Sequence, residues 1–277
     1  MTSVAVAQKR ETVAVVIPTF NVGRIIGRCL ESVAWADEII IVDMFSTDDT
    51  LEVCRRYPQV RIFQRQNRIF ANVNYGFEQA RTDWVIRLDS DEVLNPELQQ
   101  NIQNVLLCPD PDLSGYYFPS IQYMFGLPMS YGPGRRELAL RKCMFRRGTA
   151  RYQCRSEHED ITTTGRLGVL DGYYEHFTNH SVAEVVRKFN WYTDLDTERL
   201  DPRELEPPNL WRLSYRAVRM FLFFYVQHKG YRDGHLGYFS SVFRGAIYPL
   251  IEEAKRWEAW QRSVGSRPTA SRPEERS

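Results

Sequence analysis

The sequence predicts an α/β protein in which a mostly parallel central sheet is flanked by helices and followed by a C-terminal helical extension. Three observations indicate this fold class. Apolar runs and segments of helical periodicity alternate over roughly the first hundred residues, as they do in β-α-β units. The runs are apolar at consecutive positions, which is typical of strands buried on both faces. Polar residues follow the ends of the runs, where parallel sheets bind their ligands.

The strands and helices of the first half can be assigned in order. Val13 to Ile17 form an apolar run that we expect to end at Pro18, because proline has no N–H to donate. A helix is expected from about Ile25 to Val33. The further assignments are a strand at 38–42, a helix at 50–57, a strand at 60–63, a helix at about 70–80 and a strand at 84–88. Right-handed crossovers between these strands would bring their polar ends together in one crevice.

The C-terminal part is predicted to be helical. A helix at 181–200 begins with a capping box formed by Ser181 and Glu184. A second helix, at 210–225, has arginines on one stripe and mostly aromatic and aliphatic residues on another. Two interpretations of this helix stay open. It either covers the sheet and shows its arginines to water, or it lies on an anionic membrane surface.

Composition and charge give few indications of a partner. The 36 basic and 35 acidic residues nearly cancel, and no nucleic-acid partner is expected. Eight basic residues between 135 and 155 accompany a single acidic one, Glu137, so this stretch is either a polyanion site or a solvated basic surface. The odd number of cysteines, five, indicates a reduced, cytoplasmic protein. Neither a signal peptide nor a spanning helix is expected.

The segment Asp89-Ser90-Asp91, directly after the strand predicted at 84–88, is the best candidate for a metal site. Alternation along an extended chain would put both carboxylates on the same side. Carboxylate oxygens suit Mg²⁺ or Mn²⁺, which keep coordination positions free for diphosphate oxygens. The alternative is an aspartate-rich turn, because aspartate is a favoured turn residue.

A nucleotide at this crevice would have to be bound without a glycine-rich phosphate loop. Neither Gly-x-Gly-x-x-Gly nor Gly-Lys-Ser/Thr occurs in the sequence. Asp43, at the end of the second strand, can accept a hydrogen bond from the imide N–H of a uracil ring. The polar turn after it also caps the next helix, and we assign capping to Ser46 or Asp48 and the ligand role to Asp43.

Several motifs make the sequence resemble family 2 glycosyltransferases, which have the Rossmann-like GT-A fold. They are Val15 to Asn21, Cys29 to Val33, Ile41 to Asp43 with Ser46 to Asp48, Asn74 to Gly76, Asp83-Trp84 and Leu88 to Glu92. The second half resembles a bacterial subgroup that includes glucosyltransferases of the lipopolysaccharide core, through Glu157 to Glu159, His176 to Thr178, Lys188 to Thr193 and Gly230 to Gly234. We place the GT-A domain at 12–205, a helical extension that could associate with a membrane at 206–262, and flexible tails at 1–11 and 266–277.

The resemblance implies inverting, metal-dependent transfer of a sugar from a nucleotide donor, usually a UDP-sugar such as UDP-glucose, to a hydroxyl of a cell-envelope glycan or lipid-linked saccharide. The residues that would contact the donor are Pro18, Thr19, Asn21, Asp43, Ser46, Asn74 and Asp89. Those that would hold Mg²⁺ or Mn²⁺ are Asp89, Asp91 and His176. A buried, hydrogen-bonded role suits His176 equally well. The enzyme would be cytoplasmic, and peripheral at the inner face of the cytoplasmic membrane if the helix at 210–225 binds lipid.

An inverting displacement needs a general base that takes the proton of the acceptor hydroxyl. The acidic segment at 157–160 supplies the candidates, and by resemblance its His-Glu pair recurs in the family. We therefore assign the base to Glu159, with Asp160 as the second choice and His158 as a residue that orients the loop. A charged surface turn is the alternative.

Two positions depart from the family pattern, and two other function classes stay open. Val73 stands where relatives often have a basic residue, and Cys143-Met144-Phe145 stands where they tend to have Arg-Leu-Phe. The residues that could substitute are Arg141, Lys142 and Arg146. A nucleotidyltransferase would normally carry a Gly- and Lys-rich loop near the N-terminus. A non-catalytic nucleotide-sugar-binding module would be expected to lack either the base or the metal ligands.

Overall fold

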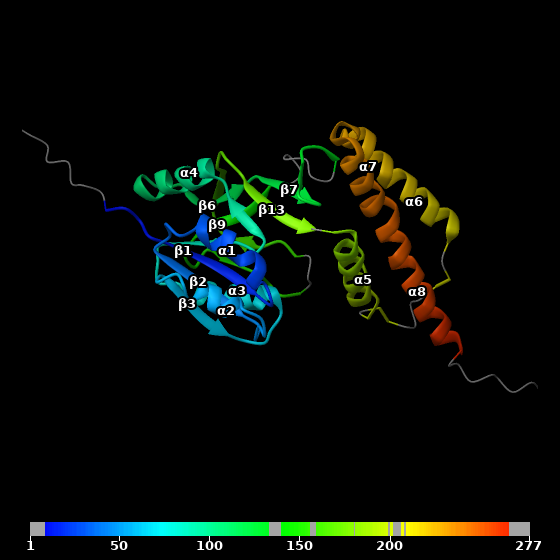
Figure 1. Ribbon diagram of the computed structural model, residues 1–277, viewed down its shortest axis with the longest axis horizontal. Helices are drawn as coiled ribbons and strands as arrows, with labels where there is room; N and C mark the ends of the chain where they lie inside the picture. Colours follow the sequence, from blue (N-terminus) through cyan, green and yellow to red (C-terminus); the bar gives the residue numbers. More distant parts are fainter. Residues whose placement is uncertain are drawn as a thin grey trace, which may run out of the picture. The chain divides into compact units, whose positions relative to one another are not determined.

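The computed structural model describes residues 9–132, 140–155, 159–179, 181–198, 200–201, 206–207 and 209–265 (Figure 1). The chain forms two compact units, Met1–Tyr123 with Arg136–Thr178 and Met124–Arg135 with Asn179–Ser277. The main part of the second unit begins earlier than the boundary predicted at residue 205, because helix α5 (Val182–Glu198) packs against helix α8 (Tyr248–Gly265). The predicted tail at 266–277 lies outside the described residues, as do residues 1–8 of the other tail.

The first unit is built on a seven-stranded sheet in the order β12-β6-β9-β4-β1-β2-β3. Its strands are β1 (Val13–Thr19), β2 (Glu38–Asp43), β3 (Val60–Gln64), β4 (Trp84–Arg87), β6 (Leu113–Phe118), β9 (Arg141–Arg146) and β12 (Arg166–Val169). The pairs β1–β2, β1–β4, β2–β3 and β6–β12 are parallel, whereas β9 runs antiparallel to β4 and β6. The predicted α/β class with a mostly parallel central sheet is confirmed.

Helices pack on this sheet from both faces, because successive side chains of a strand enter opposite cores. The helices are α1 (Gly23–Ser32), α2 (Thr50–Cys54), α3 (Ile69–Gln79) and α4 (Pro96–Leu107). Val15 and Ile17 lie in a core that includes residues of α1 and α4, whereas Val16 lies in a core that includes residues of α3. Val73 is a fully buried member of the α3 core. A basic side chain at that position would be buried in this core and would need a partner for its charge.

Two elements of the first unit differ from the sequence prediction. Strand β1 does not end at Pro18 but continues to Thr19, with Pro18 paired to Val42 of β2. Proline is tolerated because β4, on the other side of β1, pairs only as far as Val16, so no neighbour there needs the missing N–H. Helix α2 ends at Cys54 instead of residue 57, where the chain closes a turn.

A smaller sheet of the first unit carries part of the candidate site. It contains β5 (Glu92–Leu94), β13 (Tyr174–Asn179) and β7 (Ser120–Met124), in that order. The antiparallel register of β5 and β13 sets His176 opposite Glu92. The same unit has a short antiparallel pair, β10 (Ala150–Arg151) with β11 (Thr162–Thr163).

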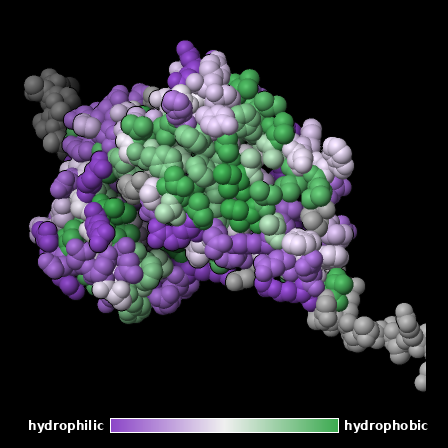
Figure 2. Space-filling model, turned by 45° about the vertical axis from the view of Figure 1, so that its right-hand side comes forward, coloured by the Kyte–Doolittle hydropathy of each residue, from purple (hydrophilic) through white to green (hydrophobic). Residues whose placement is uncertain are grey.

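The second unit is mainly helical. Besides α5, α8 and the short strand β8 (Leu127–Met129), it contains α6 (Leu210–Leu222), the π-helix η3 (Phe223–Gln227), the 3₁₀-helix η4 (Gly230–Asp233), α7 (Gly234–Val242) and the π-helix η5 (Phe243–Ile247). The predicted cap of α5 is confirmed, since Ser181 Oγ accepts the Glu184 N–H (3.2 Å). None of the described helices combines the length and apolarity needed to cross a membrane. Apolar residues gather instead on the surface (Figure 2).

Candidate active site

The loops that follow β1 and β2 are held together by their own polar side chains. Asn21 and Phe45 have φ angles of 51° and 59°, in the left-handed region that non-glycine residues seldom adopt. The Asn21 N–H donates to Ser46 Oγ (2.9 Å), and Asn21 Oδ1 accepts the Thr47 N–H (2.8 Å). Ser46 Oγ in turn donates to Asp43 Oδ1 (2.5 Å). Cross-linking of the two loops therefore stabilises these two unusual backbone conformations.

Asp43, predicted to accept the uracil imide, is fully buried. Its carboxylate accepts the Thr19 hydroxyl (3.0 Å), the Ser46 N–H (2.9 Å) and the Gln64 side-chain amide (3.3 Å), besides the Ser46 hydroxyl. Asp43 is thus a brace between the strand ends and the loop that follows. The direct contact with a uracil ring stays a prediction.

The two predicted helix caps, Ser46 and Asp48, have different roles. Asp48 Oδ1 accepts both the N–H and the hydroxyl of Thr50 (3.1 and 2.5 Å), and its Oδ2 accepts the Gly23 N–H (3.0 Å). The hydrogen bond from the Thr50 hydroxyl, together with these backbone N–H groups, lowers the pKa of Asp48 despite some desolvation. Asp48 therefore binds the first residues of α1 and α2, whereas the Ser46 hydroxyl donates to Asp43.

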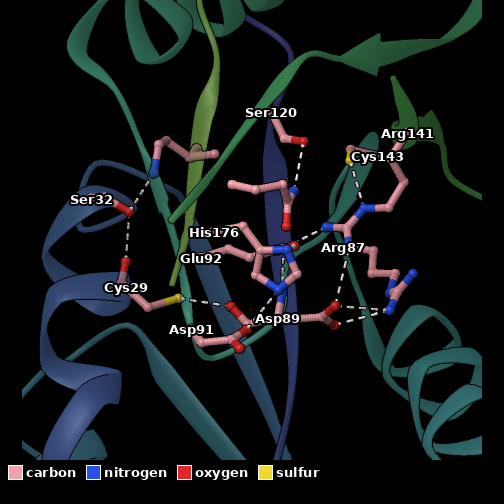
Figure 3. Close-up of polar contacts among 12 residues, drawn as sticks. Cys29, Ser32, Arg87, Asp89, Asp91, Glu92, Ser120, Arg141, Cys143 and His176 are labelled. Carbon is pink, nitrogen blue, oxygen red and sulfur yellow. Dashed lines mark hydrogen bonds and ion pairs between the residues drawn. The ribbon is translucent and has the colours of Figure 1, made fainter. Parts of the chain in front are cut away.

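The first carboxylate of the acidic segment, Asp89, is held by two arginines (Figure 3). Arg87 Nη2 lies 3.0 Å from both carboxylate oxygens, and Arg141 Nη1 lies 3.0 Å from Oδ2. Burial alone would raise the pKa of Asp89, but the two guanidinium charges outweigh it and hold the pKa well below its usual range. Asp89 is therefore a paired carboxylate.

Glu92 closes the same network from β5. Its Oε2 accepts the Asp89 N–H (2.8 Å) and a short hydrogen bond from Arg141 Nη2. Its Oε1 has no hydrogen-bond partner among the described residues, although His176 Nδ1 lies 4.0 Å away. Burial raises the pKa of Glu92, and the Arg141 charge only partly opposes this. Glu92 ends one of the family motifs listed above, but it was not predicted to be a site residue.

The second carboxylate, Asp91, faces a histidine instead of an arginine. Asp91 Oδ1 lies 3.5 Å from His176 Nε2, and the two side chains are 22% and 23% exposed. Burial lowers the pKa of His176, but the hydrogen bond to Asp91 and the charges of Glu92 and Asp91 outweigh it and raise the pKa overall. The predicted proximity of these two residues is thus observed, in a place that a ligand can reach.

Asn74, predicted to contact the donor, is hydrogen-bonded to the backbone of Tyr152. Its side-chain amide donates to the Tyr152 carbonyl (2.8 Å) and accepts the Tyr152 N–H (2.9 Å). The Tyr152 ring stacks on Phe70 at 4.2 Å, and its hydroxyl accepts from Arg87 Nη1 (2.7 Å). Asn74 therefore positions the arginine that holds Asp89, and a contact with the donor stays a prediction.

The two candidate bases differ in their surroundings. Glu159 accepts the backbone N–H groups of Cys154 (2.5 Å) and Arg155 (2.8 Å), one on each carboxylate oxygen. Asp160 is 71% exposed and forms an ion pair with Lys142 (2.7 Å). Glu157 and His158 lie outside the described residues. Glu159 is thus fixed by its loop, whereas Asp160 lies at the surface.

Arg87, like Glu92, belongs to this network but was not among the predicted site residues. It is buried within the apolar run of β4, and a buried charge needs a partner. That signal indicates a partner but does not identify it. Of the three basic residues proposed as substitutes, Arg141 reaches the acidic segment, whereas Lys142 pairs with Asp160 and Arg146 pairs with Glu11.

The residues of this edge fit a divalent cation in part. Asp91 offers a carboxylate oxygen, which suits Mg²⁺ or Mn²⁺, and His176 offers an imidazole nitrogen beside it. No group of three or more His, Cys, Asp or Glu side chains is placed to hold a metal ion in the part of the chain that the structure describes. Ligands beyond these two would therefore come from phosphate oxygens or water, as is common for Mg²⁺ and Mn²⁺. The role of Asp89 as a ligand stays a prediction, because two arginines already engage it.

Comparisons with known proteins find several similar chains. LpsC of Rhizobium meliloti, a lipopolysaccharide core biosynthesis glycosyltransferase, is 27% identical over 240 residues, which cover 84% of this chain and 87% of LpsC. The uncharacterized glycosyltransferase RP128 of Rickettsia prowazekii is 24% identical, over 82% of this chain and 80% of RP128. The solved structure of S. aureus TarS 1-349 in complex with UDP-GlcNAc has a TM-score of 0.46 and 15% identity, over 92% of this chain and 91% of that chain.

The family assignment rests mainly on residues of the first unit. The model of glycosyl transferase family 2 matches residues 14–154, about half of the chain. This range includes β1, the braced loops and the acidic segment described above. The predicted resemblance is confirmed, and a glycosyltransferase is favoured over a nucleotidyltransferase and over a non-catalytic binding module. This chain therefore belongs to glycosyl transferase family 2 and is a glycosyltransferase of the GT-A fold.

Proposed function

We propose that this glycosyltransferase is inverting and metal-dependent, and that its donor is a UDP-sugar such as UDP-glucose. The observation that supports this most is the difference between neighbouring carboxylates. Asp89 is neutralised by Arg87 and Arg141, whereas Asp91 stands beside His176 with both side chains partly exposed. A partly exposed carboxylate and imidazole at the carboxyl edge of β4 are suited to a cation that faces a diphosphate.

In this proposal Asp91 and His176 hold Mg²⁺ or Mn²⁺. When bound, the ion neutralises the negative charge that grows on the departing diphosphate. Arg141 is fixed between Asp89 and Glu92 and adds positive charge on the same side. It thereby substitutes for the basic residue that relatives often have at the position of Val73. The braced loops around Asp43 and Asn21 supply the wall against which the base and ribose rest.

Glu159 acts as the general base. The acceptor oxygen attacks the anomeric carbon, the bond from that carbon to the diphosphate oxygen breaks, and the acceptor proton moves to Glu159. Two backbone N–H groups orient the Glu159 carboxylate, so little reorganisation is needed at the moment of transfer. Asp160 is the weaker candidate because Lys142 already neutralises it.

The acceptor in this proposal is a hydroxyl of a lipid-linked cell-envelope saccharide of the lipopolysaccharide-core type. LpsC, a lipopolysaccharide core biosynthesis glycosyltransferase, aligns over most of both chains, and this supports the choice. We place the enzyme in the cytoplasm, peripheral at the inner face of the cytoplasmic membrane, where such acceptors are assembled on lipid.

A screen of UDP- and GDP-sugars tests the donor and the metal together. The purified full chain is incubated with each sugar nucleotide and Mn²⁺ or Mg²⁺, and slow release of the nucleoside diphosphate is measured. We expect release from a UDP-sugar that EDTA stops and Mn²⁺ restores. Release that persists unchanged in EDTA would contradict the metal role, and release from GDP-sugars alone would contradict the donor.

A further inference from the structure

Helix α6 and the π-helix that continues it carry an apolar stripe that no described element covers. The stripe consists of Trp211, Tyr215, Val218, Leu222 and Val226, whose residues are between 48% and 88% exposed. Their spacing of three or four residues places them on one face of the helix. A separate, partly buried face of α6 packs against η5 and α8. The helix therefore has a second apolar face beyond the one that holds it in the unit.

Arginines run along one edge of this outward stripe. Arg212, Arg216 and Arg219 follow helical spacing next to it. Arg216 pairs with Glu252 of α8 (3.2 Å). Within the described residues, Arg212 and Arg219 have neither an ion pair nor a side-chain hydrogen bond. Two positive charges thus lie unneutralised beside exposed aromatic and aliphatic side chains.

A groove opens beside the stripe, where α6 passes into η3. It encloses about 700 Å³ and is lined by Arg219, Met220, Leu222, Phe223, Val226 and Gln227. The wider π turn interrupts the regular helix at this point, and such turns are frequent at functional sites. The groove is therefore mostly apolar, with one guanidinium group among its lining residues.

An aromatic cluster adjoins the stripe. Tyr225 of η3 contacts the ring of Tyr231 at 6.3 Å and the ring of Tyr238 at 5.7 Å, and Tyr238 contacts Phe239 at 5.8 Å. Tyr231, Tyr238 and Phe239 are each about half exposed. Figure 2, in which the side of the molecule with α6 to α8 comes forward, shows a broad apolar surface bordered by hydrophilic residues. Contiguous apolar surface of this kind marks an interaction site.

We propose that this face of α6, η3 and α7 docks on an anionic lipid bilayer. Tyrosine and tryptophan rings with one apolar and one polar end suit the interfacial layer of a membrane. Arg212 and Arg219 are placed to meet lipid phosphates at the edge of the stripe, and the groove next to Arg219 accepts the upper part of an acyl chain. This docking rests on the proposed peripheral location at the membrane and is independent of the proposed donor, metal and base.

Vesicle co-sedimentation of the full chain tests the docking surface. The wild-type protein is expected to bind vesicles of phosphatidylcholine mixed with phosphatidylglycerol, and to bind pure phosphatidylcholine vesicles much less. The variant W211S/L222S/V226S is expected to bind the mixed vesicles with at least tenfold lower affinity than the wild type. The matched control is W191S, which replaces an exposed tryptophan of α5 in the same unit and should bind as wild type does.

Arginine replacement tests the charge separately. R212Q/R219Q should weaken binding to anionic vesicles by about 25-fold, since each basic residue near such a surface contributes about 1 kcal/mol, a factor of about five. Its residual binding should no longer depend on phosphatidylglycerol. Brominated acyl chains should also quench the fluorescence of the wild type more than that of W211F, which keeps the stripe apolar.

Three results would overturn the docking proposal. One is the absence of wild-type binding to either vesicle type. Another is equal binding by W211S/L222S/V226S and W191S, with circular dichroism showing that both are folded. The third is a wild-type dimer in ultracentrifugation that the triple variant converts to a monomer, without any lipid binding, because the face would then join two copies of the chain.

Discussion

The loops after β1 and β2 and the acidic segment after β4 lie at the same edge of one sheet, yet their carboxylates differ in burial and in bonding partners. In the loops, Asp43 is buried and accepts hydrogen bonds from Thr19, Ser46 and Gln64. In the acidic segment, Asp89 is likewise engaged, but Asp91 stays partly exposed beside His176. The difference indicates that most polar side chains at this edge hold the loops in place through hydrogen bonds and ion pairs. Few of them stay available to bind a charged ligand.

The largest effect is expected from D91N. We expect it to lower transfer, and donor hydrolysis with Mn²⁺, by about 10³-fold or more, because a bound ion supplies several kcal/mol of charge stabilisation. The fold should be unchanged, since Asp91 makes no ion pair with an arginine among the described residues. The control is D171N, a substitution at an exposed aspartate outside the site. Near wild-type turnover of D91N, with the same sensitivity to EDTA, would remove Asp91 from the metal site.

The substitution E159Q should reduce turnover by about 10²–10⁴-fold, the usual contribution of a positioned proton acceptor. UDP affinity should barely change, because a base that faces the acceptor does not contact the donor. The substitution D160N breaks only the exposed pair with Lys142 and should stay active. An active E159Q with an inactive D160N would move the base by one residue. Full activity of both variants would remove the base from this loop.

The substitution D89N should lower stability more than any other single change at this edge. It leaves Arg87 and Arg141 buried without their shared carboxylate, and breaking a buried ion pair costs about 3–5 kcal/mol. Chemical denaturation followed by circular dichroism measures this loss. If D89N unfolds as wild type does but fails to bind Mn²⁺ with UDP, Asp89 is a ligand rather than a structural carboxylate.

The substitution S46A tests whether Asp43 acts by holding the loop in place or by contacting the uracil ring directly. If Asp43 acts by shaping the loop, loss of the Ser46 hydroxyl should weaken UDP binding by about 1–2 kcal/mol, because that hydroxyl makes two hydrogen bonds of about 1 kcal/mol each. D43A should weaken it by about 1.5–3 kcal/mol. Calorimetry with UDP measures both. A D43A defect with no change in S46A would favour a direct contact of Asp43 with the uracil ring.

Much of the fold was predictable because its information is local. Consecutive apolar residues in β1 and β2 and helical spacing in α1 identify elements without knowledge of their partners. The extension of β1 through Pro18 was not predictable in this way. It depends on where β4 stops pairing, which is a property of a neighbouring strand.

The site was predictable where parallel topology brings strand ends together, and not where a later strand returns. Asp91 and Asp43 could be placed from their positions after strands. The pairing of Arg141 with Asp89 could not, because it follows from the antiparallel register of β4 and β9, in which Ile86 lies opposite Met144. Continuing that register sets Asp89 opposite Arg141. Local sequence patterns do not specify such a long-range pairing.

Calorimetric titration of UDP into the full chain, with Mn²⁺ and again with EDTA, tests most directly the claim that Asp91 and His176 meet the diphosphate through a cation. For the wild type we predict that Mn²⁺ tightens UDP binding at least tenfold. For D91N we predict equal, weak binding under both conditions. Tightening by Mn²⁺ that D91N retains in full would contradict the account and would place the cation elsewhere on the chain.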